Sequence, residues 1–122
     1  RAPVPVSVTS DLVTARKVGG FTRVYPVGEV PATPTYPYVV IGYGVNAPVV
    51  RVQLGGGDPL RRFFVQHFGR TANGVEDQGA ITVETFDGKA FSGDVCSLEV
   101  ATLPARDPDD GGVLTTTHTY RF

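Results

Sequence analysis

One continuous segment, residues 63–88, constrains the fold of this chain more than any other. It begins with an alternating apolar run over residues 63–68, which is typical of a β-strand. A helix-start signal follows almost at once, and an amphipathic run continues to Asp87-Gly88. A strand that turns directly into a long helix predicts a compact α+β unit, in which that helix packs on an antiparallel sheet.

The long helix is predicted over residues 73–87. Asn73 is a suitable N-cap residue, and Glu76 three positions later completes a pattern that resembles a capping box. Thr82 and Thr85 are mediocre helix formers, so this helix is expected to depend on packing rather than on intrinsic propensity. Apolar or small residues recur at helical spacing and form one predicted stripe: Val75, Gly79, Val83, Phe86 and Ala90.

The remaining elements are mostly predicted strands. A short helix is predicted over residues 11–18, capped by Thr9 or Ser10 and ended by Gly19-Gly20. Residues 1–7 are predicted to be extended or loose, and the proline-rich residues 31–37 to cross the surface stiffly. Apolar and β-branched runs predict extended segments at residues 21–27, 38–45, 60–70, 95–103 and 113–122.

Alternation along three of these strands predicts which side chains point inward. In the strand 60–70, Phe63, Val65 and His67 share one face, while Phe64, Gln66 and Phe68 share the other, so both faces are candidates for burial. In the strand 95–103, the inward set is Cys96, Leu98 and Val100. In the last strand, which follows a predicted turn at 106–112, it is Leu114, Thr116, His118, Tyr120 and Phe122, with Thr115, Thr117, Thr119 and Arg121 opposite.

Length and composition limit the class of protein. A chain of 122 residues matches one domain, and an apolar fraction of 41% supports a modest core. The 15 glycines and 10 prolines favour turns and β-structure over a helical bundle. A net charge of −1 argues against avid, sequence-independent binding of nucleic acid. No apolar run is long enough to cross a membrane, and residues 1–6 lack the hydrophobic core of a signal peptide.

The single cysteine, Cys96, excludes an internal disulfide. Its place in an alternating strand pattern predicts a buried and inert thiol rather than a reactive one. One unpaired cysteine also suits a reducing compartment.

Residues 46–59 are predicted to form a protruding loop or hairpin arm. Residues 49–54 could pair as a short strand, whereas the glycine run 55–57 with Asp58-Pro59 excludes regular structure there. Long connections in a small domain are usually functional or disordered. A solvated surface explains the flanking arginines equally well, but arginine is enriched at protein interfaces. The predicted interface residues are Arg51, Gln53, Gly55, Gly56, Gly57, Asp58, Arg61, Arg62 and Arg70.

Two glycine-rich stretches resemble nucleotide-binding loops only weakly. Gly42-Tyr43-Gly44 lacks the third glycine and the following helix of a dinucleotide site. The glycine run 55–57 lacks the Lys-Ser/Thr pair of a phosphate-binding loop. A nucleotide cofactor is therefore not expected.

The other candidate sites also have simpler explanations. Asp107, Asp109 and Asp110 lack the spacing of a calcium loop, and a hairpin turn accounts for them. His67 and His118, the only two histidines, lie in strand patterns without the spacing of metal ligands. We therefore predict no metal site and no enzymatic activity.

Several short segments occur in an order that is familiar from one family. They are residues 35–41, the strand 62–71, the helix end 86–88, Cys96-Ser97-Leu98, residues 106–111 and Tyr120-Arg121-Phe122. Over residues 21–122 the chain thereby resembles the tail terminator (head–tail joining, minor tail) proteins of long, non-contractile-tailed bacteriophages and related prophages. The N-terminal helix is shorter, and the glycine-rich arm longer, than the family pattern.

The resemblance implies an antiparallel sheet with a long helix packed on it, and a role in virion assembly without catalysis. Subunits would form a hexameric ring on the last ring of the tail tube, stop tube growth and join the tail to the neck. The implied partners are other copies of the chain, the tail tube protein and a neck or head completion protein. DNA would pass through the ring without specific binding, and the protein would be made in the host cytoplasm.

Two alternatives stay open. The first keeps the virion but changes the position, to a head completion or neck connector protein or a tail tube subunit. The second is a small cytosolic binding or hydrolytic domain, which predicts a concave pocket near His67 or His118.

Overall fold

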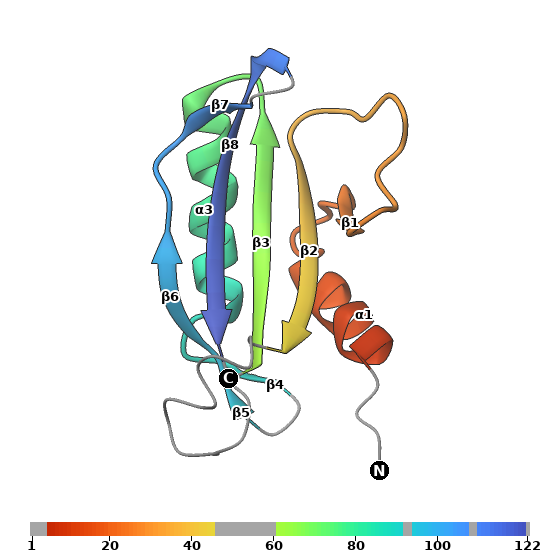
Figure 1. Ribbon diagram of the computed structural model, residues 1–122, viewed down its shortest axis with the longest axis vertical. Coiled ribbons are helices and arrows are strands. Elements are labelled where there is room, and N and C mark those ends of the chain that lie inside the picture. Colours follow the sequence, from red (N-terminus) through yellow and green to blue (C-terminus); the bar gives the residue numbers. More distant parts are fainter. Residues whose placement is uncertain (1–4, 46–60, 92–93, 108–109, 122) are drawn as a thin grey trace.

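A computed structural model describes residues 5–45, 61–91, 94–107 and 110–121 (Figure 1). Six strands form one mixed sheet in the order β1-β2-β3-β8-β6, with β7 also paired to β8. Within the described ranges no helix combines the length and hydropathy needed to span a bilayer. The sheet strands are β1 (Val24–Pro26), β2 (Tyr38–Val45), β3 (Arg61–Gly69), β6 (Ser97–Ala101), β7 (Ala105–Asp107) and β8 (Asp110–Arg121).

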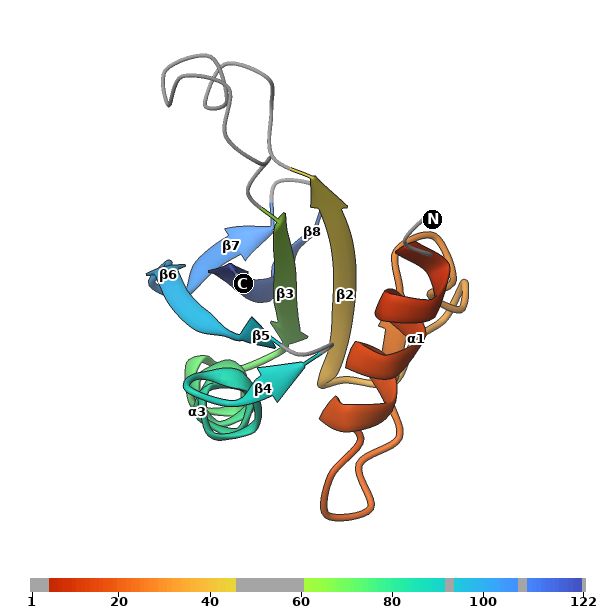
Figure 2. The same ribbon diagram turned by 90° about the horizontal axis from the view of Figure 1, so that it is seen from below.

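The helices are α1 (Pro5–Arg16) and α3 (Ala72–Phe86). The long helix α3 packs behind the central strands, and α1 lies beside β2 and β1 at one border of the sheet (Figures 1 and 2). A separate antiparallel pair, β4 (Ala90–Phe91) with β5 (Asp94–Val95), follows α3. The predicted α+β class, with one long helix on a sheet, is confirmed.

Strand β3 forms the centre of the sheet, between β2 and β8, and is antiparallel to both. Its side chains alternate as predicted: Phe63, Val65 and His67 are buried, and Phe64, Gln66 and Phe68 are half-buried. This buried face of β3 packs against α3.

The core lies between this face and the two helices. The Phe63 ring stacks on the Tyr120 ring with centroids 5.1 Å apart and meets the Phe86 ring edge-on at the same distance. Leu12 joins the cluster from α1, and Cys96 is fully buried within it. The predicted buried thiol is therefore confirmed. Such close aromatic pairs contribute about 0.5–1.5 kcal/mol beyond the area they bury.

The predicted N-cap of the long helix was wrong. The cap is Thr71, whose Oγ1 accepts a hydrogen bond from the Gly74 amide at 3.0 Å. Thr71 has extended dihedrals directly after β3, so the chain turns into the helix earlier than the Asn73 prediction requires. Both residue types are good caps, which is why the sequence did not distinguish them.

The apolar stripe of α3 also differs in part from the prediction. Val75, Gly79 and Phe86 are buried as expected, but Thr82 rather than Val83 completes the stripe. A hydroxyl is tolerated at that position because Thr82 is fully hydrogen-bonded. Ala90 lies beyond the helix, in β4.

Helix α1 is longer at its start than the predicted 11–18 and ends two residues sooner. It begins at Pro5, and proline suits the first turn of a helix because the amide there needs no partner. Residues 5–7 are therefore helical rather than extended. The predicted stop at Gly19-Gly20 was wrong, because the helix ends at Arg16 and the two glycines form a separate turn with φ angles of 60° and 81°, which favour glycine.

The sheet is not wholly antiparallel. Strand β1 pairs with β2 in parallel, with Val24 opposite Val39, while the other pairs are antiparallel. The proline-rich connection returns the chain to the end of the sheet where β1 begins, so β2 runs in the same direction as β1. The predicted antiparallel sheet did not include this parallel pair, whose two strands are joined through the proline-rich crossing predicted at residues 31–37.

The predicted strand 95–103 is broken. It is divided at Cys96, whose backbone amide donates to the Lys89 carbonyl at 2.7 Å, into β5 and β6. A register shift between Leu98 and Val100 then turns Val100 outward, where 55% of it is exposed. The predicted inward position of Val100 was therefore wrong.

Strand β8 begins before the predicted residue 113, because β7 and β8 extend into the predicted turn 106–112. Residues 108–109, including Asp109, lie outside the described residues, as does Phe122. Thr116, His118 and Tyr120 are buried as predicted. Near the register shift by Asp107, however, Val113 is buried and Leu114 only half-buried, which reverses the predicted order there.

Candidate functional site

The residues predicted to form an interface divide into two groups. Arg51, Gln53, Gly55, Gly56, Gly57 and Asp58 lie outside the described residues, as does the possible strand at 49–54. Arg61, Arg62 and Arg70 lie in or directly after β3. Arg62 and Arg70 are therefore separated by most of the length of that strand, at opposite ends of the sheet.

At one end of the sheet, Arg62 joins three strands. Its Nε donates to Glu99 Oε1 at 2.6 Å and its Nη2 to Glu99 Oε2 at 3.2 Å, while Arg121 Nε lies 3.8 Å from Glu99 Oε2. Hydrogen bonding to Arg62 lowers the pKa of the Glu99 carboxyl. The group leaves one net positive charge on this surface, and such partly exposed ion pairs contribute only about 0–1 kcal/mol to stability.

At the other end, Arg70 lies over an aromatic group. Its guanidinium carbon is 4.5 Å from the centroid of the Tyr36 ring. The Tyr36 ring is 5.3 Å from that of Tyr38, which stacks on Phe68 at 4.8 Å. Exposed arginine over stacked aromatic rings is a composition typical of interface centres.

Between these ends the sheet has a mixed polar and aromatic outer face. The strand register places Phe64 opposite Thr119, Gln66 opposite Thr117 and Phe68 opposite Thr115. In the described part of the chain, no helix covers this face (Figures 1 and 2). These side chains are half-buried.

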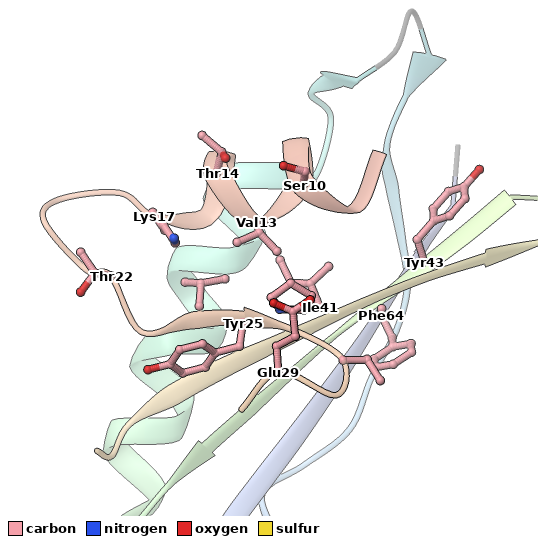
Figure 3. A pocket seen from close by; sticks show the side chains of 14 residues that line it. Ser10, Val13, Thr14, Lys17, Thr22, Tyr25, Glu29, Ile41, Tyr43 and Phe64 are labelled. Atoms are coloured by element: carbon pink, nitrogen blue, oxygen red, sulfur yellow. The ribbon is translucent and has the colours of Figure 1, made fainter. Parts of the chain in front are cut away.

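A groove of about 830 Å³ lies at the α1 border of the sheet (Figure 3). We call it the α1–β1 groove; its lining residues are Ser10, Val13, Thr14, Lys17, Thr22, Val24, Tyr25, Pro26, Val27, Glu29, Ile41, Gly42, Tyr43 and Phe64. Aliphatic and aromatic side chains dominate, and Lys17 and Glu29 are the charged ones. The sequence did not predict this groove, because the groove depends on the parallel pairing of β2 with β1.

The two histidines are structural members of the core. Thr82 accepts a hydrogen bond from Arg16 Nε at 2.7 Å and donates to the Gln78 carbonyl at 3.0 Å. Its remaining lone pair accepts from His67 Nε2 at 2.6 Å, so His67 Nδ1 accepts from the Thr116 hydroxyl at 3.0 Å. With a neutral imidazole, this assignment gives both ring nitrogens of His67 and the Thr82 hydroxyl a hydrogen-bond partner. Burial, assisted by the charge of Arg16 and by the neighbouring His118, lowers the pKa of His67 to about 3.

His118 packs beside this group. Its ring centroid is 4.8 Å from that of His67, and its Nδ1 is 3.2 Å from the Tyr120 hydroxyl. Burial lowers the pKa of His118 as well. A small hollow of about 320 Å³ between α3 and the β6–β7 connection reaches this ring. The described residues contain no group of three or more His, Cys, Asp or Glu side chains that could hold a metal ion.

Arg16 was not singled out by sequence reasoning. It is fully buried, its Nη2 donates to both the Gln78 carbonyl and the Gln78 Oε1, and its Nη1 has no hydrogen-bond partner in the described part of the chain. Its spacing from Leu12 places both on one helical face, which is the signal that could have found it.

No protein-family model matches the sequence, and no curated protein matches it. Among solved structures, the fold is similar to a chain in the structure described as the virion of native gene transfer agent (GTA) particle. The TM-score is 0.65, the similarity covers 94% of this chain and 90% of that chain, and 16% of the aligned residues are identical. At this identity the similarity shows a shared fold over nearly the whole of both chains.

Proposed function

We propose that this protein is a structural component of a virion, and specifically a tail terminator whose ring caps the tail tube and joins the tail to the neck. The observation that carries the proposal is the shared fold, over almost the full length of both chains, with a chain of a gene transfer agent virion. The sequence resemblance to tail terminators independently supports the finer role.

The chemistry of the described residues supports a role without catalysis. His67 and His118, the obvious candidates for proton transfer, are buried and hydrogen-bonded to side chains of the core. A general base near neutral pH needs a pKa close to 7, whereas burial moves both histidines below their ordinary value.

In this proposal the subunit contacts are made by the ends and borders of the sheet. Arg62 with its partner Glu99 at one end of β3, and Arg70 over Tyr36 at the other, would meet different neighbours, and Arg61 in the same strand is assigned to the same contacts. Arg51, Gln53 and residues 55–58 are also proposed to make contacts with neighbours. The partners are further copies of the chain, the tail tube protein and a neck protein, while DNA passes through the ring without specific contacts.

Native mass tests the proposal directly. Light scattering on a size-exclusion column is expected to give a discrete particle near six subunits, and electron microscopy is expected to show that particle on the ends of purified tail tubes. Protein that neither forms a ring nor binds tube ends would contradict the terminator role. Deleting residues 55–58 tests the arm, because a normal tail length and normal head joining in that variant would remove it from the contact surface.

The virion comparison fits a tail tube subunit or a neck connector equally well, since the matching structure is a whole particle. The same experiment separates them. A tube subunit polymerises without limit, whereas a terminator stops at one ring. A neck connector binds the head portal in preference to the tube end.

A further inference from the structure

We propose that an extended segment of another virion protein binds between α3 and the outer edge of β6. The segment would add a strand to β6 and place one apolar side chain in the hollow of about 320 Å³, which we call the α3–β6 hollow. A lysine or arginine two positions from that side chain would lie beside Glu76. This inference names a class of partner, and it rests on the proposed function only for the source of the segment.

The outer edge of β6 is open to a further strand. Among the described strands β6 pairs with β8 alone, and it forms that border of the sheet (Figures 1 and 2). The Thr102 amide donates to the Thr117 carbonyl at 3.0 Å, so the amide and carbonyl of the preceding residue, Ala101, point away from β8. Ala101 is also exposed, so a strand at about 4.8 Å can pair with its main chain.

The opposite edge of the sheet, at β1, is blocked. Pro26 has no amide to donate, and its carbonyl accepts a hydrogen bond from the Glu29 amide at 3.1 Å. The Val24 amide donates to the Thr22 carbonyl at 2.9 Å. A proline and main-chain groups that are already bonded protect an edge from further pairing. Strand addition is therefore directed to β6.

The α3–β6 hollow lies beside the open edge. Small residues line it from both sides, Gly79 and Ala80 from α3 and Ala101 from β6, and they leave room for a side chain from outside. Leu103 also lines it and is 84% exposed. An apolar side chain in the hollow would cover Leu103, and burial of both groups stabilises the contact.

The strand register determines which side chain of the segment enters the hollow. Ala101 lies opposite His118 in β8, and both residues line the hollow. Directly opposite residues share one face of a sheet, so the residue that pairs with Ala101 would direct its side chain to the same side. The next side chain on that face is two positions away, about 6.6 Å along the strand.

Charge at the hollow favours a basic residue in that second position. In the described part of the chain, the titratable side chains that line the hollow are the exposed Glu76 and the buried His118. Helix α3 also carries Asp77 and Glu84, and its sequence contains no lysine or arginine. A lysine or arginine beside Glu76 is therefore complementary to this surface, whereas an acidic residue is repelled.

A synthetic peptide tests the chemistry of the site. The probe is a capped, fluorescently labelled heptapeptide of threonines with leucine in the fourth position and lysine in the sixth, which share one face of an extended chain. Anisotropy is expected to show saturable binding with a Kd below about 1 mM. Exchanging the lysine with the threonine before it moves the lysine to the other face and should weaken binding about threefold or more. No saturable binding, or equal binding of both peptides, would overturn the proposal.

Substitutions at the hollow localise the binding. Ala80→Phe fills the hollow from an exposed position, so the variant is expected to fold and to bind the probe about tenfold or more weakly. Ala90→Phe, at an exposed alanine of β4 outside the lining, is the matched control and should bind normally. Glu76→Gln should weaken binding about threefold, whereas Asp77→Asn, at an exposed acid outside the lining, should not. Normal binding by Ala80→Phe would overturn the site.

Hydrogen exchange reports strand addition directly. The Ala101 amide, followed by NMR, is expected to exchange about tenfold or more slowly when the probe is saturating, while the amides of the β4–β5 pair keep their rates. Probe binding without this protection would overturn strand addition. Protection that appears without the probe and rises with protein concentration would assign the edge to a second copy of the chain, and would also overturn the proposal.

These results remain separable from the proposed function. If the protein forms rings and caps tube ends but does not bind the probe, the α3–β6 site is wrong while the terminator role stands. If the probe binds and protects Ala101 although the protein neither forms rings nor binds tube ends, the site stands and the terminator role fails.

Discussion

Among the residues that the structure describes, the buried cation Arg16 has no carboxylate partner. Burial lowers its pKa to about 10, so it keeps its charge at neutral pH. That charge, together with burial, disfavours a second positive charge on His67 and on His118. The polar centre of this core therefore holds one cation, and the pKa values of both imidazoles lie below their ordinary value.

This arrangement predicts that the protein loses stability as the pH falls below 6.5. The unfolded chain binds a proton at His67 near pH 6.5, whereas the folded chain does so only near pH 3. Between these values the unfolded state holds the extra proton, so the free energy of unfolding decreases by about 1.4 kcal/mol per pH unit for that group. Urea unfolding at pH 7, 6 and 5 measures the slope above the range where carboxylates titrate.

The variant His67→Gln is the control for this pH dependence. It is expected to be less stable than the wild type at all pH values. Between pH 7 and 5, however, the slope of its free energy of unfolding against pH should be smaller by the contribution of about one proton. His118 still titrates in that variant, so a smaller slope remains. An unchanged slope would show that His67 is not the group responsible.

The cap of α3 gives a second prediction for single residues. Thr71→Ala removes the hydroxyl that accepts the Gly74 amide and is expected to lower the free energy of unfolding by about 1 kcal/mol. Asn73→Ala, at the position that sequence reasoning favoured, is expected to change it by less than about 0.5 kcal/mol, because Asn73 is exposed inside the first turn. Thermal unfolding of both variants checks this, and the reverse order would restore Asn73 as the cap.

Strands β2 and β3 approach closely where Gly42 faces Phe64. A Cβ at Gly42 would overlap the Phe64 ring and come within 2.9 Å of Val27 Cγ2. Gly42→Ala is therefore expected to cost about 1–3 kcal/mol, since the ring must leave its place. Gly111→Ala in β8 is the control, because nothing lies within 4 Å of its Cβ position.

A double variant separates crowding from backbone effects at this position. If the Phe64 ring is the obstacle, Phe64→Ala and Gly42→Ala should be strongly coupled, by at least about 0.5 kcal/mol. Additive losses in urea unfolding would point to the backbone of β2 instead.

Two side chains hold helix α1 against the rest of the domain: Leu12 packs in the core, and the Arg16 guanidinium donates hydrogen bonds to Thr82 and Gln78 of α3. Arg16→Lys keeps the charge but cannot make the same set of bonds, and we expect a loss of about 1–3 kcal/mol. Hydrogen exchange should accelerate in residues 5–16 more than in β3 or β8. Lys17→Arg, the opposite change at the exposed neighbouring position, should leave exchange unaltered. Uniform acceleration across the sheet would contradict a local anchoring role.

Elements with strong periodicity were predictable, and those set by long-range pairing were not. The alternation of Phe63, Val65 and His67 gave the inner face of β3, because two-residue periodicity follows from strand geometry alone. The parallel entry of β2 and the outward turn of Val100 depend on how the chain pairs with distant strands, which local pattern does not encode. Arg16 lay in a predicted helix, yet its burial depends on Thr82 and Gln78 from another element.

At the scale of the whole molecule, the chain has different surfaces at its two borders. The groove border is lined mainly by apolar side chains together with Lys17 and Glu29, while at the opposite border Leu103 is exposed beside the acidic helix α3. If copies associate as in the proposed ring, each contact removes apolar area from water and stabilises the folded subunit. Assembly and stability should therefore be coupled.

The coupling predicts a melting temperature that depends on protein concentration. Each tenfold increase in concentration favours every contact by about 1.4 kcal/mol. For a chain of 122 residues that corresponds to a rise in Tm of a few degrees. Scanning calorimetry over a hundredfold range of concentration measures this, and a constant Tm for the wild-type protein would show that its fold gains nothing from association.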